Sequence, residues 1–202
     1  SIHLRSIMTA LPTSPFLTAA RGERATHTPV WFMRQAGRSL PEYRALRGEG
    51  SILDAIKKPE FAAEFTLQPV RRYGVDAAVL YSDIVVSSHA VGFGIDVAPG
   101  TGPVAPVPLR TNDDLARLRA LEPETDMHYV MQTIDMLVKE LEVPLLGFAG
   151  APFTVASYLI EGRPSRTYEN SFAMMRNNDV LWHSIMERLS QHAIALVSAQ
   201  IQ

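Results

Sequence analysis

The densest group of basic side chains in this 202-residue sequence lies in its first quarter. Four arginines, Arg34, Arg38, Arg44 and Arg47, fall in a stretch that holds one carboxylate, Glu42. Guanidinium groups offer planar, paired donors that match carboxylates and phosphates, so the pattern predicts a site for a small polyanion. A solvated basic turn with weak surface ion pairs is the alternative that composition leaves open.

A single aspartate, Asp83, stands inside the almost entirely apolar segment 77–86. A carboxylate in such surroundings is costly unless donors or positive charge satisfy it. At the carboxyl end of a barrel strand, Asp83 would point into the usual active-site mouth. Alternatively, it would cap the amides of the turn that contains Val85 and Val86. The sequence leaves both interpretations open.

A glycine-containing turn, GFAGAPFT at 147–154, follows another apolar run and leads into a helix that carries Tyr158. The glycines permit a tight turn and a close approach of the backbone to a ligand. Their spacing lacks the third glycine of the dinucleotide fingerprint, and no P-loop lysine follows. Tyr158 lies on an apolar face, so core packing with a bonded hydroxyl is the alternative to a role in a site.

Composition narrows the possible functions. Nineteen basic and twenty-one acidic residues give a net charge of −2, so no polycationic field is available for a nucleic acid. The absence of cysteine excludes disulfides, thiolate nucleophiles and thiolate metal sites within this sequence, and it fits a reducing compartment. No histidine pair has zinc-ligand spacing, so no metal site is expected. No signal-peptide core is found. The uncharged segment 143–160 contains two prolines and two glycines, which predict a strand, a turn and a helix rather than a membrane span. These features favour a cytosolic protein.

The elements that position these residues follow from apolar patterning. Strands are expected at 30–33, 76–81 and 145–148, and helices at 14–21, 59–73, 126–142 and from 179 to the chain end. Gly37 and Pro41 predict a mobile loop over 34–44, and the prolines and glycines of 99–108 predict an irregular connection. Asn112 or Asp113 is expected to cap a short helix.

Alternating strands and helices predict a parallel sheet with helices outside it. Three strands fit the first part of a barrel better than a wide doubly wound sheet, since a complete barrel takes about 250 residues. We therefore predict one α/β domain over 1–202, the N-terminal part of a (β/α)8 TIM-type barrel. Residues 1–13 are expected to be disordered or an addition to the natural chain. Because the sequence ends inside a strong helix, we expect the barrel to be incomplete. Since the strand at either edge then lacks a neighbour, we expect the 202 residues alone to be weakly active or inactive, or to depend on a partner fragment.

Two long motifs together resemble the uroporphyrinogen decarboxylase family. One comprises 29–38 (PVWFMRQAGR) and 41–44 (PEYR), and the other is 147–162 (GFAGAPFTVASYLIEG). The similarity runs from about residue 15 to residue 166 without a large gap. It implies a cytosolic barrel enzyme that acts as a homodimer without metal or organic cofactor. Such an enzyme removes carbon dioxide from the four acetates of uroporphyrinogen and gives coproporphyrinogen, in haem biosynthesis.

The same resemblance implies roles for individual residues. Arg34 and Arg38 would bind substrate carboxylates, with Arg34 as the candidate proton donor. Asp83 would accept hydrogen bonds from the four pyrrole N–H groups, and Tyr158 would support an acetate or Asp83. The backbone of three further residues would line the site: Gln35, Ala36 and Gly37. Asp83, Arg34 and Tyr158 are thus the candidate catalytic residues.

The sequence also departs from the family pattern and leaves alternatives. The family uses a serine and a histidine from later strands, and none of the six histidines here lies in a matching motif. His183 and His192 are expected to be solvated or packing residues. One rival is a related barrel methyltransferase that uses zinc and a corrinoid, which the lack of cysteine and the Arg34–Arg38 pair disfavour. The other rival is a non-catalytic fragment that binds porphyrinogen.

Overall fold

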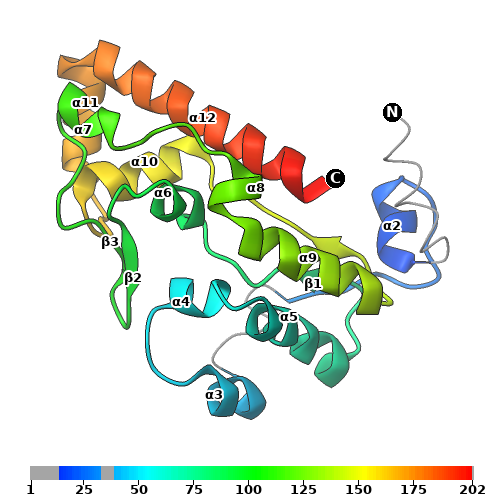
Figure 1. The fold of residues 1–202 in the computed structure, drawn as a ribbon. Coiled ribbons are helices and arrows are strands. Elements are labelled where there is room, and N and C mark those ends of the chain that lie inside the picture. The colour runs from blue at the N-terminus through cyan, green and yellow to red at the C-terminus, as the bar shows by residue number, and fades with distance from the viewer. Residues whose placement is uncertain (1–13, 33–38, 202) are drawn as a thin grey trace.

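The computed structural model describes residues 14–32 and 39–201, so the predicted N-terminal segment 1–13 lies outside the described residues. Two strands, β1 (Ala78–Val79) and β4 (Leu145–Leu146), pair in parallel (Figure 1). Helix α5 (Pro59–Tyr73) packs on β1 and on helix α9 (His128–Glu140). The predicted parallel α/β arrangement is therefore confirmed at this strand pair.

The prediction of a strand at 30–33 is wrong for residues 30–32, the part that the structure describes. Val30, Trp31 and Phe32 form no strand, although the Val30 carbonyl accepts a hydrogen bond from the Asp76 amide at 2.9 Å. The segment thus lies beside the start of β1 without a continuous ladder. In the described ranges the sheets are two-stranded, β1–β4 and β2–β3, so the closed barrel stays a prediction.

The sequence predicts an irregular connection over 99–108, and this prediction is wrong for part of the region. Strands β2 (Asp96–Ala98) and β3 (Gly102–Val104) form an antiparallel hairpin. Pro103 is tolerated in β3 because a two-stranded hairpin has only edge strands, where a missing amide need not break a ladder. Gly100 and Gly102 adopt positive φ values of 75° and 100°, which suit them to the tight turn.

Side-chain caps start helices α2 (Pro15–Ala20) and α7 (Asn112–Ala116). Ser14 caps α2 as predicted, accepting a hydrogen bond from the Leu17 amide. The short helix α7 is capped by Thr111 instead of Asn112 or Asp113, in a capping box with Asp114. Further helices are α4 (Ile52–Ile56), α6 (Val86–Ala90), α8 (Pro123–Asp126), α10 (Pro152–Glu161), α11 (Glu169–Asn177) and α12 (Asp179–Ile201).

The predicted loop over 34–44 is wrong from Pro41 onward, because helix α3 occupies Pro41–Arg47. A proline at the first helical position has its ring preset for the helix and lacks only an amide that would be unbonded there. Pro41 therefore starts a helix where the sequence analysis took it to interrupt one.

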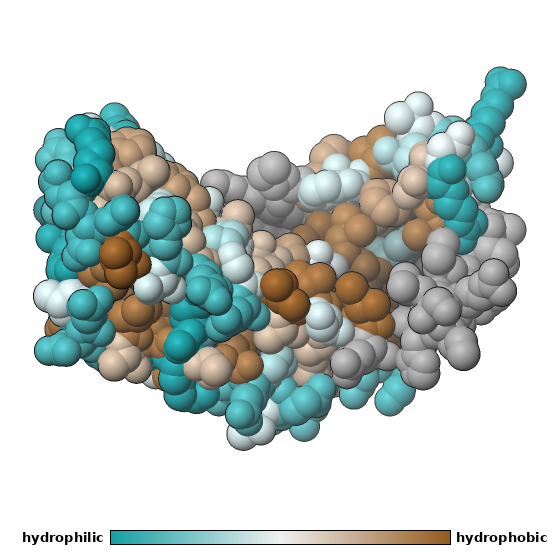
Figure 2. Space-filling view, turned by 90° about the horizontal axis from the view of Figure 1, so that it is seen from above, coloured by the Kyte–Doolittle hydropathy of each residue, from teal (hydrophilic) through white to brown (hydrophobic). Residues whose placement is uncertain are grey.

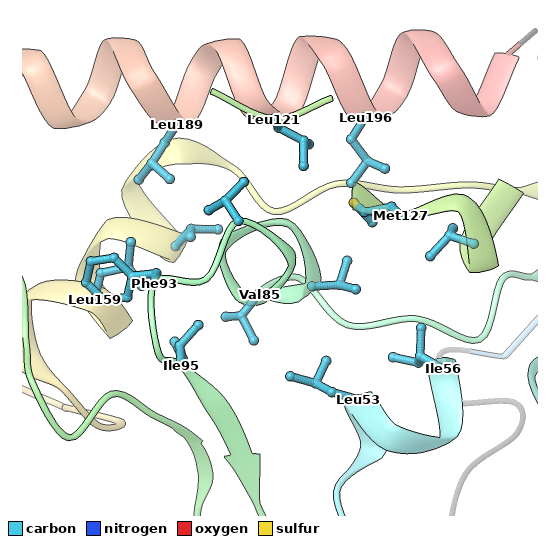
Figure 3. Close-up of a cluster of buried hydrophobic side chains, with 14 of the residues drawn as sticks. Leu53, Ile56, Val85, Phe93, Ile95, Leu121, Met127, Leu159, Leu189 and Leu196 are labelled. Carbon is cyan, nitrogen blue, oxygen red and sulfur yellow. The ribbon is translucent and has the colours of Figure 1, made fainter. Parts of the chain in front are cut away.

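One cluster of buried apolar side chains holds these elements together (Figure 3). Val85, which is 0% exposed, lies at its centre. Leu189 and Leu196 of α12 approach from one side, and Leu53 and Ile56 of α4 from the other. The segment that carries Asp83 is therefore anchored in the core two residues further along the chain.

Apolar residues also reach the surface between polar ones (Figure 2). On α12, Val180 is 73% and Ile194 66% exposed, and Val197 and Ile201 are exposed as well. This helix therefore has an apolar face that the described residues leave uncovered. Among the helices that the structure describes, none combines the length and apolarity needed to cross a membrane.

His192 of α12 is buried, as a packing residue would be, whereas His183 is exposed. The His192 Nε2 lies 2.7 Å from the Arg119 carbonyl, while its buried Nδ1 finds no hydrogen-bond partner in the described part of the chain. Burial lowers the pKa of His192, the Arg119 carbonyl and Asp126 oppose this, and Arg188 and Arg119 add to it.

We expect the folded state to lose stability on acidification because of His192. A lowered pKa in the folded state means that the unfolded chain binds the proton more tightly. The stabilising contribution of neutral His192 is complete above the ordinary histidine pKa of about 6.5. It is lost as the pH falls towards and through the lower pKa that His192 has in the folded state. Denaturant unfolding at a series of pH values should show a slope of up to about 1.4 kcal/mol per pH unit below that point. His192→Gln should reduce the slope and the exposed control His183→Gln should not; equal slopes in both would contradict the assignment.

Candidate active site

The parallel strand pair places two candidate loops at one edge of the structure. The segment 80–85 follows β1, and the glycine-containing turn 147–151 follows β4. Parallel strands end at the same edge, so these segments are neighbours. A Cβ atom built on Gly150 would lie 2.8 Å from the Ile84 carbonyl oxygen and 3.0 Å from the Ile84 Cβ. The two loops are thus in direct contact beside Asp83, and only glycine fits there.

Asp83 is half-buried at this edge. Its Oδ1 accepts a hydrogen bond from the Val85 amide at 3.0 Å, and its carbonyl accepts one from the Val86 amide at 3.2 Å. Burial raises the pKa of Asp83, and the Val85 hydrogen bond opposes this rise. One carboxylate oxygen thus caps the turn, as one of the two interpretations predicts, and a role of Asp83 in a site stays a prediction. Among the described residues no cation forms a salt bridge with Asp83.

Tyr158 lies on α10, the helix that begins directly after the glycine-containing turn. Its ring is half-buried and packs against the core cluster. Within the described ranges its hydroxyl makes no hydrogen bond, including none to Asp83. The expected core packing is therefore present, but among the described residues the hydroxyl has none of the partners that a purely structural role would give it.

Five predicted substrate-binding residues lie outside the described residues: Arg34, Gln35, Ala36, Gly37 and Arg38. The structure describes the chain on both sides of this segment. On one side Val30 bonds Asp76, and on the other Leu40 is 1% exposed at the start of α3. The Val30 flank therefore lies beside Asp76, shortly before β1, and the Leu40 flank is buried.

A pair of tyrosines was missed by the sequence analysis. The hydroxyls of Tyr43 and Tyr81 lie 2.9 Å apart, and the Tyr81 amide donates to Thr66 Oγ1 at 3.0 Å. Burial and the hydrogen bond with Tyr43 raise the pKa of Tyr81, and the neighbouring Arg47 opposes this rise. Their only signal in the sequence is position, because Tyr43 lies in the PEYR motif and Tyr81 stands two residues before Asp83.

Across 14–32 and 39–201, no group of three or more histidine, aspartate or glutamate side chains is arranged to hold an ion. The arrangement that the described residues do present is a desolvated carboxylate next to a glycine turn. Such a carboxylate can accept hydrogen bonds and stabilise a nearby positive charge.

Comparison with solved structures supports the fold. The chain is similar to a methyltransferase from Methanosarcina mazei, with a TM-score of 0.63 over 94% of this chain and 55% of that chain. The sequence identity is 19%, so this similarity concerns the fold alone.

Comparison with known sequences is more specific. The uroporphyrinogen decarboxylase of Streptomyces griseus is 53% identical over 203 residues, which cover 100% of this chain and 55% of that protein. Those of Streptomyces coelicolor and Salinispora tropica are 53% and 52% identical, over 96% and 93% of this chain and 55% and 51% of those proteins. The chain thus spans about half the length of the curated relatives it matches. Residues 11–202 match the family model described as uroporphyrinogen decarboxylase (URO-D), and the chain therefore belongs to the URO-D family.

Proposed function

We propose that this chain carries out or contributes to the decarboxylation of uroporphyrinogen to coproporphyrinogen. Each of four acetate side chains loses carbon dioxide and takes up one proton, which leaves a methyl group. The observation that carries this proposal is the half-buried Asp83, which follows β1 and is adjacent to Ile84, the residue that contacts Gly150 of the glycine-containing turn. Family membership supports the same activity.

Asp83 is proposed to bind the centre of the substrate. Its carboxylate would accept hydrogen bonds from the four pyrrole N–H groups of the macrocycle. Loss of carbon dioxide needs an acceptor for the electron pair of the broken bond, and a protonated pyrrole provides one. A desolvated carboxylate facing that ring stabilises the positive charge as it develops. Since the substrate is nearly four-fold repetitive, one central anion can present each acetate in turn.

Arg34 and Arg38 are proposed to bind the carboxylates at the rim, with Arg34 as the proton donor. The backbone of 35–37 would line the same site. Tyr158 is proposed to support the acetate or Asp83. Its half-buried ring, whose hydroxyl makes no hydrogen bond among the described residues, is compatible with this role. Metal or organic cofactors are not needed in this scheme, because the protonated substrate itself accepts the electrons.

The architecture proposed for this function is a single domain that contributes the N-terminal part of a (β/α)8 barrel. The parallel β1–β4 pair supports it, and so does the uncovered apolar face of α12, which a further layer of the fold would bury. We also propose a cytosolic homodimer, and low activity for the 202 residues alone.

The experiment that tests the proposal supplies uroporphyrinogen to protein expressed from the full open reading frame and, separately, to the 202-residue chain. We expect release of carbon dioxide and the stepwise appearance of porphyrinogens with fewer carboxylates, ending at coproporphyrinogen. Substrate binding without carbon dioxide would indicate the non-catalytic alternative. Methyl transfer from a corrinoid in place of decarboxylation would indicate the methyltransferase alternative. Either result from the full-length protein would refute the proposal.

A further inference from the structure

The Tyr43–Tyr81 pair connects helix α3 to the end of β1. The two hydroxyls lie 2.9 Å apart, and the rings pack together with a centroid separation of 6.0 Å. The Phe65 ring of α5 packs against both rings, with ring centroids 4.8 Å apart for Tyr43 and 4.9 Å apart for Tyr81. Aromatic packing alone would bury these rings, so the hydroxyl bond adds a directional contact to a cluster that is already packed.

Tyr81 is also fixed through its backbone. Its amide donates to Thr66 Oγ1 at 3.0 Å, and this hydroxyl donates to the Ala62 carbonyl at 2.8 Å. Tyr81 is therefore held to helix α5 by its main chain and to α3 by its side chain. Its neighbour two residues along the chain is Asp83.

The span 81–85 consequently has two fixed ends. Tyr81 is 8% exposed and bonded as described, and Val85 is 0% exposed at the centre of the core cluster (Figure 3). Asp83 lies midway between them and bonds the Val85 amide. A shift of Tyr81 would move the Asp83 carboxylate because only Ser82 separates the two residues.

We infer that the Tyr43–Tyr81 hydroxyl pair is a positioning element, which holds the Asp83 carboxylate at the end of β1 through the backbone of Tyr81. The inference rests on the proposed function of Asp83 and deepens it. The pair does not touch the reacting atoms in this scheme. It acts by limiting the movement of the carboxylate, and preorganised charge stabilises a transition state more than a mobile charge does.

The test uses Tyr43→Phe, Tyr81→Phe and the double variant in protein expressed from the full open reading frame. These changes keep the rings and remove the bond. We expect kcat to fall about three- to tenfold, the range that one intramolecular hydrogen bond corresponds to, while KM stays within about twofold. The double variant should be no slower than either single variant, because each change breaks the same bond.

Tyr129→Phe is the matched control. Tyr129 is also 8% exposed, and its hydroxyl has no hydrogen bond within the described ranges. All rates are expressed per folded molecule, with the folded fraction measured by circular dichroism at the assay temperature. The acid limb of the kcat/KM profile should report protonation of the Asp83 carboxylate. It should therefore move in Tyr43→Phe and Tyr81→Phe and stay in place in Tyr129→Phe.

The outcomes separate this inference from the proposed function. Wild-type protein without decarboxylase activity, or an unimpaired Asp83→Asn variant, would refute the proposed function and the inference that rests on it. If the wild type is active and Asp83→Asn is impaired, the tyrosine variants decide alone. Losses equal to that of Tyr129→Phe, additive losses in the double variant, or an effect on KM alone would overturn the positioning role.

Discussion

Asp83→Asn is expected to lower the rate of uroporphyrinogen decarboxylation on the order of 10²–10³-fold, the usual effect of removing one preorganised electrostatic group. Asparagine has nearly the same shape and can still accept the Val85 hydrogen bond, but it carries no charge to stabilise the protonated macrocycle. Carbon dioxide release under single-turnover conditions measures the effect. A turnover near that of the wild type would refute the role proposed for Asp83.

The stability of this variant should change in the opposite direction. Burial raises the pKa of Asp83 in the folded state. Such a group stabilises the fold below its unfolded pKa, and this contribution is lost as pH rises through the folded pKa. At neutral pH the ionised Asp83 therefore lowers the stability of the fold, and asparagine removes this unfavourable charge. We expect the variant to melt at the same temperature as the wild type or higher.

Asp76→Asn is a matched control at the opposite end of β1. Burial tends to raise the pKa of Asp76, but hydrogen bonds from the Val30 amide and His27 lower it overall. Its carboxylate lies 2.7 Å from the Val30 nitrogen and 2.9 Å from His27 Nε2. Loss of the charge should therefore reduce stability at neutral pH. Turnover per folded molecule should fall far less than in Asp83→Asn.

The Asp83 carboxylate should set the acid limb of the pH profile of kcat/KM. Because burial raises its pKa, kcat/KM should begin to fall at a pH above the ordinary aspartate value of about 3.9. Pyrrole N–H donors stabilise the ionised form, so the acid limb of kcat should lie at lower pH than that of kcat/KM. This limb should disappear in Asp83→Asn.

Gly150→Ala is expected to have the second large effect. The added Cβ would meet the Ile84 carbonyl oxygen at 2.8 Å and also crowd a methyl group of Val155. Main-chain atoms must move to relieve the contact with Ile84, which is adjacent to Asp83. We expect a loss of about 1–3 kcal/mol in the free energy of unfolding and, from a displacement on the order of 1 Å at the site, up to about 10²-fold in turnover.

Gly147→Ala provides the control in the same turn. There the added Cβ would meet the side-chain end of Gln200, which can rotate away and gives up its 3.0 Å hydrogen bond to the Phe148 carbonyl. The expected cost is about 1 kcal/mol, with a much smaller loss of turnover. Denaturant unfolding and single-turnover rates measure both variants. Equal effects at the two glycines would show that the contact with Ile84 does not position the site.

Several elements were predictable from the sequence because their signals are local. Helix α5 spans 59–73 as predicted and begins with Pro59 in its first turn; the structure adds Gly74 as a left-handed C-cap. Ser14 caps its helix, and helix α12 begins at Asp179 as predicted. The errors arose where one residue type suits two contexts: Pro41 starts a helix, and Pro103 is accommodated on an edge strand.

The sequence alone determined the α/β pattern and the family motifs, and it singled out Asp83 and Tyr158 as candidates, because residue type, spacing and caps depend on short stretches of chain. Only the tertiary structure decided that Gly150 lies against Ile84, and that Tyr43 bonds Tyr81 across 38 residues. Contacts between such distant residues depend on how helices and strands pack into one core, which no local preference specifies. The same packing removes water from around Asp83 and raises its pKa.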